Sequence, residues 1–124
     1  MAYRVYDTEQ KCWVNDVYLS TNGELYKEIR SFFGIVKLVP LNSERYVYHN
    51  DINLYDKNEA LIFEGDVVNA QVGEDKFVTG FVAYVNELAG YAILCDDTEE
   101  FYMLGSDVCE FIEIVGNVFD NKNE

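Results

Sequence analysis

Carboxylates are the residues of this chain whose type and spacing could do chemistry. The densest group is Asp96, Asp97, Glu99 and Glu100. Hard divalent cations bind several carboxylate oxygens at once, so this group is a candidate cation site. A charged tip of an exposed hairpin explains it as well, and we favour that interpretation. An EF-hand loop is excluded here and in residues 56–61, because both lack its alternating acids and central glycine.

A second candidate is the tripeptide Glu64-Gly65-Asp66. On one strand edge, Glu64 and Asp66 would share a face and could act as paired carboxylates. In the alternative interpretation Gly65 makes a turn into a strand and the acids accept hydrogen bonds from loop amides. We favour the turn, because turn chemistry explains all three residue types.

Histidine, cysteine and tryptophan provide few further candidates. His49 is the only histidine, and it could be a general base, a ligand or a surface residue. The cysteines, Cys12, Cys95 and Cys109, are widely spaced without a CxxC motif, which argues against a disulfide framework or a zinc site. We expect them to be small buried apolar residues. Trp13 could stack on nucleic-acid bases, but few basic residues surround it.

These residues lead us to predict no catalytic residue, no cofactor and no metal, and a protein that is not an enzyme. An enzyme would need convergent polar side chains in a pocket, and the sequence shows no motif for one.

The negative charge is concentrated in one half of the chain. Residues 1–57 contain seven bases and eight acids, 7 − 8 = −1, and residues 58–124 contain two bases and fifteen acids, 2 − 15 = −13. Such a surface repels phosphate backbones and anionic lipids, so direct binding of nucleic acid or membrane is not expected. A partner with a basic surface is compatible with the charge, and so is a role in solubility.

The composition indicates a folded, mainly β protein. Hydrophobic residues make up 49% of the 124 residues and aromatic residues 15%, with many Val, Ile, Tyr and Phe, which favour strands. We expect a β-rich segment over 1–57 and a second domain over 58–124, packed as one unit. No secretory leader or membrane-spanning run is evident, and we expect a cytoplasmic protein with reduced thiols.

The first half is predicted to be a meander. Strands are expected at 3–6, 12–20, 24–29, 35–41 and 44–49. Asn22-Gly23 favours a type I′ hairpin turn. Pro40 cannot donate a backbone hydrogen bond, which indicates an edge or the end of a strand. Residues 53–65 are turn-like.

The second half has a more regular pattern. Strands are expected at 66–72, 77–85, 91–95, 99–104 and 109–115. A bulge or bend is expected at Gly80, and a tight 3₁₀ turn at 105–107. Five short strands of this kind indicate a small closed barrel of the SH3 type. Gly116-Asn117 is expected to end the last strand, so that Val118-Phe119 seals the barrel.

Several stretches resemble the YopX family of phage and prophage proteins. They are YRVYD (3–7), DVYLSTNGELY (16–26), LYDKNEALIFEGDVV (54–68) and IEIVGNVFDN (112–121). The resemblance implies an SH3-like barrel in the C-terminal half and a phage origin, and it implies no activity. The family usually has glycine where this chain has Asn53 and Glu59. Asn53 still suits a left-handed turn, whereas the turn at Glu59 is expected to differ.

Two larger features complete the functional hypotheses. FVTGFVAYV (77–85) is apolar on both faces, so Phe77, Phe81 and Val85 are expected to pack on the N-terminal half or on a second subunit. We therefore predict a phage-derived accessory protein that is a protein-binding or self-assembling module and a homo-oligomer. The alternative is an acidic inhibitor, resembling DNA in charge, of a host nucleic-acid-binding protein.

Overall fold

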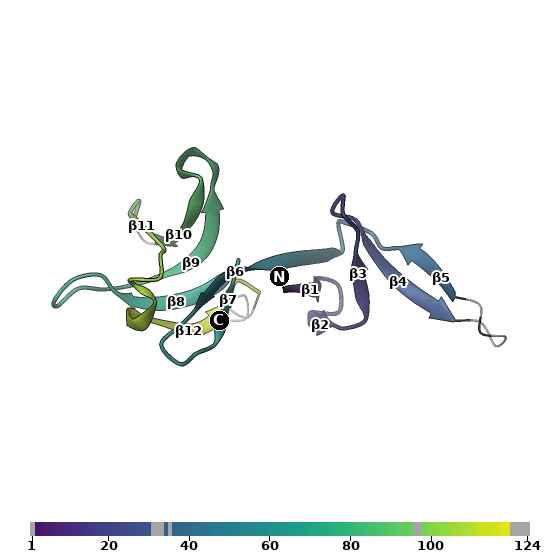
Figure 1. Cartoon of the computed structure of the whole chain (residues 1–124), viewed down its shortest axis with the longest axis horizontal. Coiled ribbons are helices and arrows are strands. Elements are labelled where there is room, and N and C mark those ends of the chain that lie inside the picture. The colour runs from purple at the N-terminus through teal and green to yellow at the C-terminus, as the bar shows by residue number, and fades with distance from the viewer. Residues whose placement is uncertain (1, 31–33, 35, 96–97, 120–124) are drawn as a thin grey trace. The chain divides into compact units, whose positions relative to one another are not determined.

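Twelve strands and two short 3₁₀ helices make up a computed structural model that describes residues 2–30, 34, 36–95 and 98–119 (Figure 1). The strands are β1 (Tyr3–Asp7), β2 (Cys12–Val14), β3 (Val17–Leu19), β4 (Leu25–Arg30), β5 (Val36–Pro40), β6 (Tyr46–Tyr55), β7 (Leu61–Phe63), β8 (Asp66–Gln71), β9 (Phe77–Val85), β10 (Gly90–Cys95), β11 (Phe101–Met103) and β12 (Ile112–Asn117). The 3₁₀ helices are η1 (Asn86–Leu88) and η2 (Cys109–Phe111). The prediction of a mainly β protein is confirmed.

In the described residues no helix is long and apolar enough to cross a membrane.

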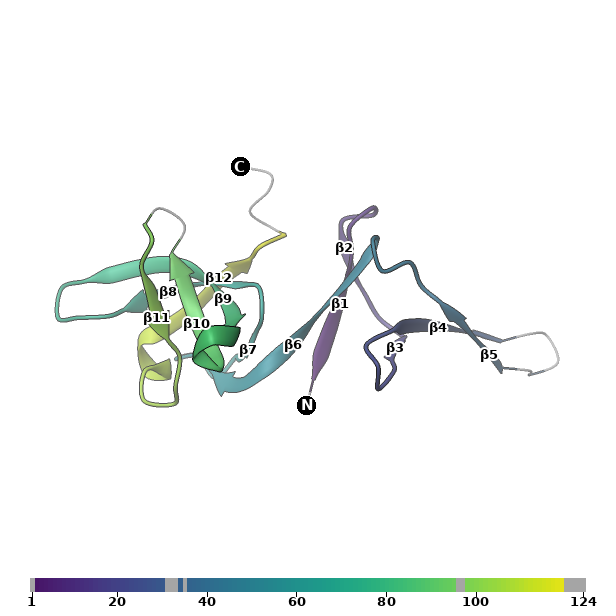
Figure 2. The same cartoon turned by 90° about the horizontal axis from the view of Figure 1, so that it is seen from above.

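The chain forms two compact units. Tyr3–His49 make up the N-terminal unit, and Ala2 with the described part of Asn50–Glu124 makes up the C-terminal unit. The sheets have the orders β2-β1-β6-β7, β3-β4-β5 and β11-β10-β9-β8-β12. Strand β6 begins in the first unit and ends in the second, as Figure 2 shows from above.

The expected single strand over 12–20 is two strands in different sheets. β2 pairs with β1, whereas β3 pairs with β4. Between them Asp16 has φ of 62°, a left-handed conformation outside the β region. The prediction is wrong here because an αL residue redirects the chain, and alternating hydrophobicity does not reveal such a residue.

The turn at Asn22-Gly23 is also different from the predicted type I′ turn. Ser20 N–H bonds to the Glu24 carbonyl at 2.8 Å, and Gly23 N–H bonds to the Ser20 carbonyl at 3.1 Å. Of the two turn residues only Gly23 has positive φ, 86°. This is a three-residue loop ending in a left-handed glycine, the next most common hairpin connection. Pro40 lies on the edge strand β5, as predicted.

A partly buried ion pair connects the end of β1 with the residue before β6 in the N-terminal unit. Asp7, 3% exposed, receives two hydrogen bonds from the Arg45 guanidinium, each 2.8 Å long. Its Oδ1 also accepts the N–H groups of Glu9 at 3.0 Å and Gln10 at 3.1 Å. Arg45, followed by the two backbone donors, outweighs the opposing effect of burial and lowers the pKa of Asp7 to about 2.

This pair predicts an acid-dependent stability. Since the pKa of Asp7 is about 2 in the folded protein against 3.8 in the unfolded chain, its contribution is complete above pH 3.8 and disappears as pH falls towards 2. We expect Asp7→Asn to destabilise the protein at pH 7 and to flatten the fall in stability over that acid range, measured by denaturant unfolding. Glu9→Gln, at the exposed end of the same arginine, is the control and should change little. Equal pH profiles for wild type and Asp7→Asn would contradict the assignment.

In the C-terminal unit, one curved five-stranded sheet forms a half-barrel (Figure 1). Its strands lie where the pattern predicts five strands, except that residues 109–111 form η2 and β12 starts at Ile112. β12 pairs antiparallel with β8, which lies far earlier in the chain, so β11 and β12 are the two edges. Closure into a barrel stays a prediction.

Gly116-Asn117 does not end the last strand. Ile114 pairs with Val68 and Gly116 with Val67, so Val115 is an extra residue in a β-bulge, and the strand continues to Asn117. Val118 N–H then bonds to the Gly65 carbonyl at 2.8 Å. Cross-strand pairing with β8 outweighs the local turn preference of a Gly-Asn dipeptide.

Gly80 serves close packing instead of a bulge. The pairing of β9 with both neighbours passes through Gly80 without a shift in register. A Cβ atom at this position would lie 2.4 Å from the Leu94 carbonyl oxygen. Glycine is therefore required by the close approach of β10.

The core of the C-terminal unit gathers apolar residues from strands that are distant in sequence. Its most buried members are Ile62, Val68, Val82, Ile93 and Ile112, each at most 2% exposed. Val68 and Ala70 face this core, in agreement with the alternation predicted for 66–72, but Val67 on the other face is also buried.

Residues 53–65 are strands joined by tight turns, so the prediction of a turn-like segment is wrong for part of it. β6 continues to Tyr55 and β7 covers Leu61–Phe63. Asn53 and Glu59 have φ of 60° and 65°. Glu59 thus keeps the left-handed conformation that the family's usual glycine suits, contrary to the expected difference.

Glu59→Gly should therefore stabilise the protein. A left-handed non-glycine residue costs about 1 kcal/mol, which corresponds to a rise of about 3–5 °C in Tm for a chain of this size. Glu87→Gly is the matched control, because Glu87 is also an exposed acid but has no positive φ. It should leave Tm unchanged or lower it, and thermal unfolding followed by circular dichroism measures both. An equal Tm gain in the two variants would assign the effect to charge.

Candidate functional site

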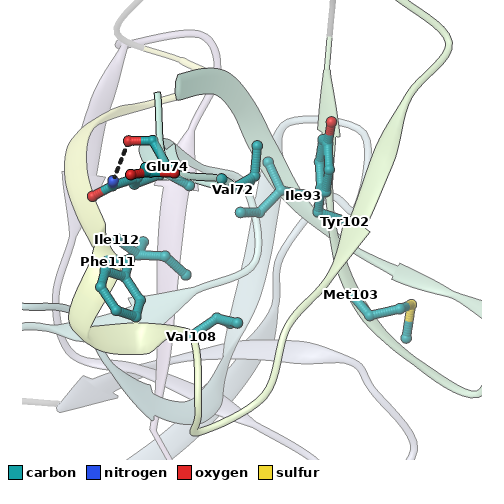
Figure 3. A pocket seen from close by; sticks show the side chains of 11 residues that line it. Val72, Glu74, Ile93, Tyr102, Met103, Val108, Phe111 and Ile112 are labelled. Carbon is teal, nitrogen blue, oxygen red and sulfur yellow. Dashed lines mark hydrogen bonds between the residues drawn. The ribbon is translucent and has the colours of Figure 1, made fainter. Parts of the chain in front are cut away.

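The C-terminal unit contains an apolar groove of about 450 Å³. It lies between β11 and the segment that leads through η2 into β12, and the end of β8 with its following loop lies beside it (Figure 3). The lining residues are Ala70, Gln71, Val72, Gly73, Glu74, Ile93, Tyr102, Met103, Val108, Phe111 and Ile112. We call it the β11–η2 groove.

The groove connects the surface with the core. Ile93 and Ile112 are 2% and 1% exposed and belong to the core, whereas Phe111 is 45% exposed. The Met103 side chain points away from the groove, because Met103 pairs with Ala92 on the other face of the sheet. Figure 3 shows Val108 and Phe111 on one side of the groove and Tyr102 on the other. An incoming apolar side chain would bury exposed Phe111 against a hydrophobic floor.

The chain segments that line the groove are acidic. Residues 70–76 and 99–112 contain six acids, Glu74, Asp75, Glu99, Glu100, Asp107 and Glu110, and one base, Lys76, so 1 − 6 = −5. Lys76 Nζ lies 3.0 Å from Glu100 and 5.7 Å from the centre of the Tyr102 ring. Tyr102 and Glu100 together raise the pKa of Lys76, and Lys76 lowers that of Glu100. The groove thus combines an apolar floor with a negative surrounding.

Glu64-Gly65-Asp66 has the hydrogen bonds that the turn interpretation requires. Asp66 accepts the Phe63 N–H at 2.8 Å, and Glu64 Oε1 accepts the Asn50 N–H at 3.0 Å. Gly65 has φ of 82°, and its N–H bonds to the Val82 carbonyl at 2.8 Å. The tripeptide turns the chain into β8 and fastens that turn to β9.

Asp56 fastens a second turn to a distant strand. Its Oδ1 accepts the N–H groups of Asn58 and Ala60, both at 2.9 Å, and its Oδ2 accepts the Ile114 N–H at 3.0 Å. Burial alone would raise the pKa of Asp56, but these three donors outweigh it and lower the pKa. The Lys57 N–H adds a bond to the Ile112 carbonyl at 2.9 Å.

The sole histidine lies in an aromatic cluster of the N-terminal unit. The ring centres of His49 and Trp13 are 6.4 Å apart, and Arg4 lies 4.5 Å above the Trp13 ring. Burial and the Arg4 charge lower the pKa of His49 to about 4, so the imidazole is neutral at pH 7. Tyr6 packs edge-on against Trp13 at 5.0 Å. These contacts give His49 a packing role, and Arg4 covers part of the Trp13 ring, which is 36% exposed.

The cysteines divide between core and surface. Cys95 and Cys109 are buried, as predicted, whereas Cys12 is exposed on β2, so the prediction is wrong there. Cys109 donates to the Gly105 carbonyl at 3.3 Å, and burial raises its pKa. Its thiol therefore stays protonated at neutral pH.

Two members of the 96–100 acid cluster, Asp96 and Asp97, lie outside the described residues. Of the rest, Glu100 accepts hydrogen bonds from Lys76 at 3.0 Å and from the Tyr102 hydroxyl at 2.8 Å. Over the described part of the chain, no group of three or more His, Cys, Asp or Glu residues could hold a metal ion.

The three residues predicted for self-association have different exposures. Phe77 is 70% exposed, whereas Phe81 and Val85 are partly buried. The groove residues Met103, Val108 and Phe111 were not candidates from sequence. The available signal was a pair of apolar stretches, FYML and CEFI, separated by only a few residues.

A family model described as YopX protein matches residues 2–123. The chain belongs to the YopX family. Among solved structures it resembles protein yopX from Bacillus subtilis, with a TM-score of 0.59 and 16% identity over 98% of this chain and 94% of that one. It also resembles protein EF1440 from Enterococcus faecalis, with a TM-score of 0.52 and 17% identity over 96% and 93%.

Comparison with curated proteins gives no match. At such low identity the two structures show a shared fold. The Asp56 and Glu64–Asp66 contacts explain the YopX-like stretch 54–68 as a set of turns that hold this fold together.

We expect Asp56→Ala to lower the free energy of unfolding by about 3 kcal/mol, since three backbone donors lose a charged acceptor. Asp56→Asn should lose about half as much, because the amide keeps one acceptor oxygen. Because the folded pKa of Asp56 is lowered, its contribution is complete above the ordinary value of 3.8 and declines at lower pH. Denaturant unfolding between pH 7 and pH 3 measures this, with exposed Asp75→Ala as the control. Equal losses for Asp75→Ala and Asp56→Ala would contradict the role of Asp56.

Proposed function

We propose that this YopX-family protein is a phage-derived, cytoplasmic protein-binding module. Its C-terminal unit would bind a segment of a partner protein that carries both basic and large apolar side chains. The observation that carries this proposal is the β11–η2 groove, in which exposed Phe111 and partly buried Tyr102 border a core floor inside segments with a net charge of −5.

The strand order supports an SH3-like barrel as the scaffold of this unit. Read from one edge, the sheet runs β12-β8-β9-β10-β11, a meander whose last strand returns beside the first. The 3₁₀ helix η2 precedes that last strand. SH3-type barrels share this order, and such folds host many functions, so the proposal depends on the groove and not on the scaffold.

Charge supports a basic partner. The C-terminal unit, residues 50–124, contains three bases and seventeen acids, 3 − 17 = −14, and residues 3–49 contain six of each. Negative potential around the groove would speed association with a cationic segment and disfavour anionic ones. The apolar floor would then provide most of the affinity.

The second candidate is an acidic inhibitor of a host nucleic-acid-binding protein. The concentration of the whole net charge in one unit favours it. The two candidates differ in what they require. An inhibitor that imitates DNA needs charge alone, whereas the module needs the apolar groove as well.

A peptide array tests the module. We expect peptides with Lys or Arg beside Phe, Leu or Met to bind, and basic peptides without a large apolar residue to bind at least about 10-fold more weakly, since one buried side chain contributes about 1.5 kcal/mol or more. Phe111→Gln should weaken binding by a similar factor. Val115→Gln, which removes a 50% exposed residue outside the groove, is the matched control.

The outcomes separate the two candidates. Equal binding of basic peptides with and without apolar residues, unaffected by Phe111→Gln and lost at high salt, would favour the inhibitor. No peptide binding at all would overturn the module.

A further inference from the structure

The three-stranded sheet of the N-terminal unit has an exposed apolar face. Residues that pair directly across antiparallel strands lie on the same face. Tyr18 pairs with Tyr26, which pairs with Pro40, while Glu28 pairs with Leu38 and Arg30 with Val36. This face, called the β3–β5 face below, therefore presents five apolar residues and one pair of opposite charges.

Four of the five apolar residues of this face are exposed, and Tyr26 is partly buried. Tyr18, Val36 and Leu38 are 49%, 48% and 52% exposed. An apolar patch of this kind on a sheet marks an interaction surface. Edge-to-edge pairing is a poor use of it, because Pro40 has no N–H to donate on the edge strand β5.

The charges of the face are self-complementary. Glu28 binds Arg30 within the chain, with 2.9 Å between Oε2 and Nε, and the Arg30 side chain is 66% exposed. In a two-fold contact the same surface meets itself, so Glu28 of one copy can face Arg30 of the other. The face has no net charge, and its unit has none either, with six acids and six bases over residues 3–49.

The rest of the molecule disfavours other contacts between copies. The C-terminal unit, with a net charge of −14, repels a second copy of itself. The opposite face of the same sheet carries Lys27 and Lys37 and no acid from the three strands, so two such faces would also repel. We propose that the protein forms a two-fold dimer in which the β3–β5 face of one copy packs on the same face of a second copy. This proposal is independent of the groove.

Mass in solution tests the dimer. Light scattering coupled to gel filtration should give a mass that rises with protein concentration from that of one chain, 14.3 kDa, towards twice that mass, with a Kd in the micromolar range because the face is small. Leu38→Gln should raise Kd by about 10-fold or more, since it removes one large apolar contact. Ile29→Gln is the matched control, because Ile29 is 50% exposed on the opposite face. The groove variant Phe111→Gln should also stay dimeric.

A charge exchange tests the geometry. Glu28→Arg gives a face with two positive charges, and Arg30→Glu gives one with two negative charges. We expect each variant alone to be monomeric and an equimolar mixture to form a heterodimer, because the faces are then complementary only between chains. Circular dichroism confirms that both variants are folded.

Three results would overturn the proposal. They are a monomeric wild type, a dimer that Ile29→Gln or Phe77→Gln disrupts while Leu38→Gln does not, and a mixture of the two charge variants that stays monomeric. The second result would place self-association on another surface, including the β9 surface suggested by sequence.

Discussion

The Asp56 carboxylate is the constraint on which the C-terminal unit depends. A single buried side chain accepts backbone donors from its own turn and from β12, which lies 58 residues further along the chain. The donors at Asn58 and Ala60 organise the turn between β6 and β7. The donor at Ile114 brings the last strand to that turn, where β12 pairs with β8 and supplies Ile112 to the core. Without this acceptor three N–H groups would lose their partner in a buried place, which is costly.

The Glu64-Gly65-Asp66 turn continues the same arrangement. Gly65 donates to Val82 on β9 and accepts from Val118 after β12, so one residue connects both strands that border β8. The acidic residues of this stretch are therefore structural acceptors. A concentration of carboxylates in a sequence does not by itself indicate catalysis, because backbone donors in tight turns need the same chemical group.

The net negative charge is confined to one of the two units. The C-terminal unit combines a net charge of −14 with one apolar groove, while the N-terminal unit has no net charge and an open sheet face. The negative charge of the C-terminal unit repels a second copy of that unit, whereas the sheet face of the N-terminal unit, which has no net charge, does not oppose contact between copies. The two proposed interfaces follow from this difference, and each would operate without the other.

Local patterns in the sequence determined much of the secondary structure. Alternating hydrophobicity and β-branched residues were sufficient to predict the strands at 66–72, 77–85 and 91–95. The missing N–H group of Pro40 was sufficient to predict an edge strand. Both effects depend only on a residue and its neighbours in sequence. The tertiary structure decided the rest. Asp16 divides one expected strand, β8 keeps β12 extended through Gly116-Asn117, and Glu59 stays left-handed because Asp56 holds its turn. The groove likewise exists only because β11 and η2 approach the end of β8, and contacts between such distant residues have no signature in local sequence.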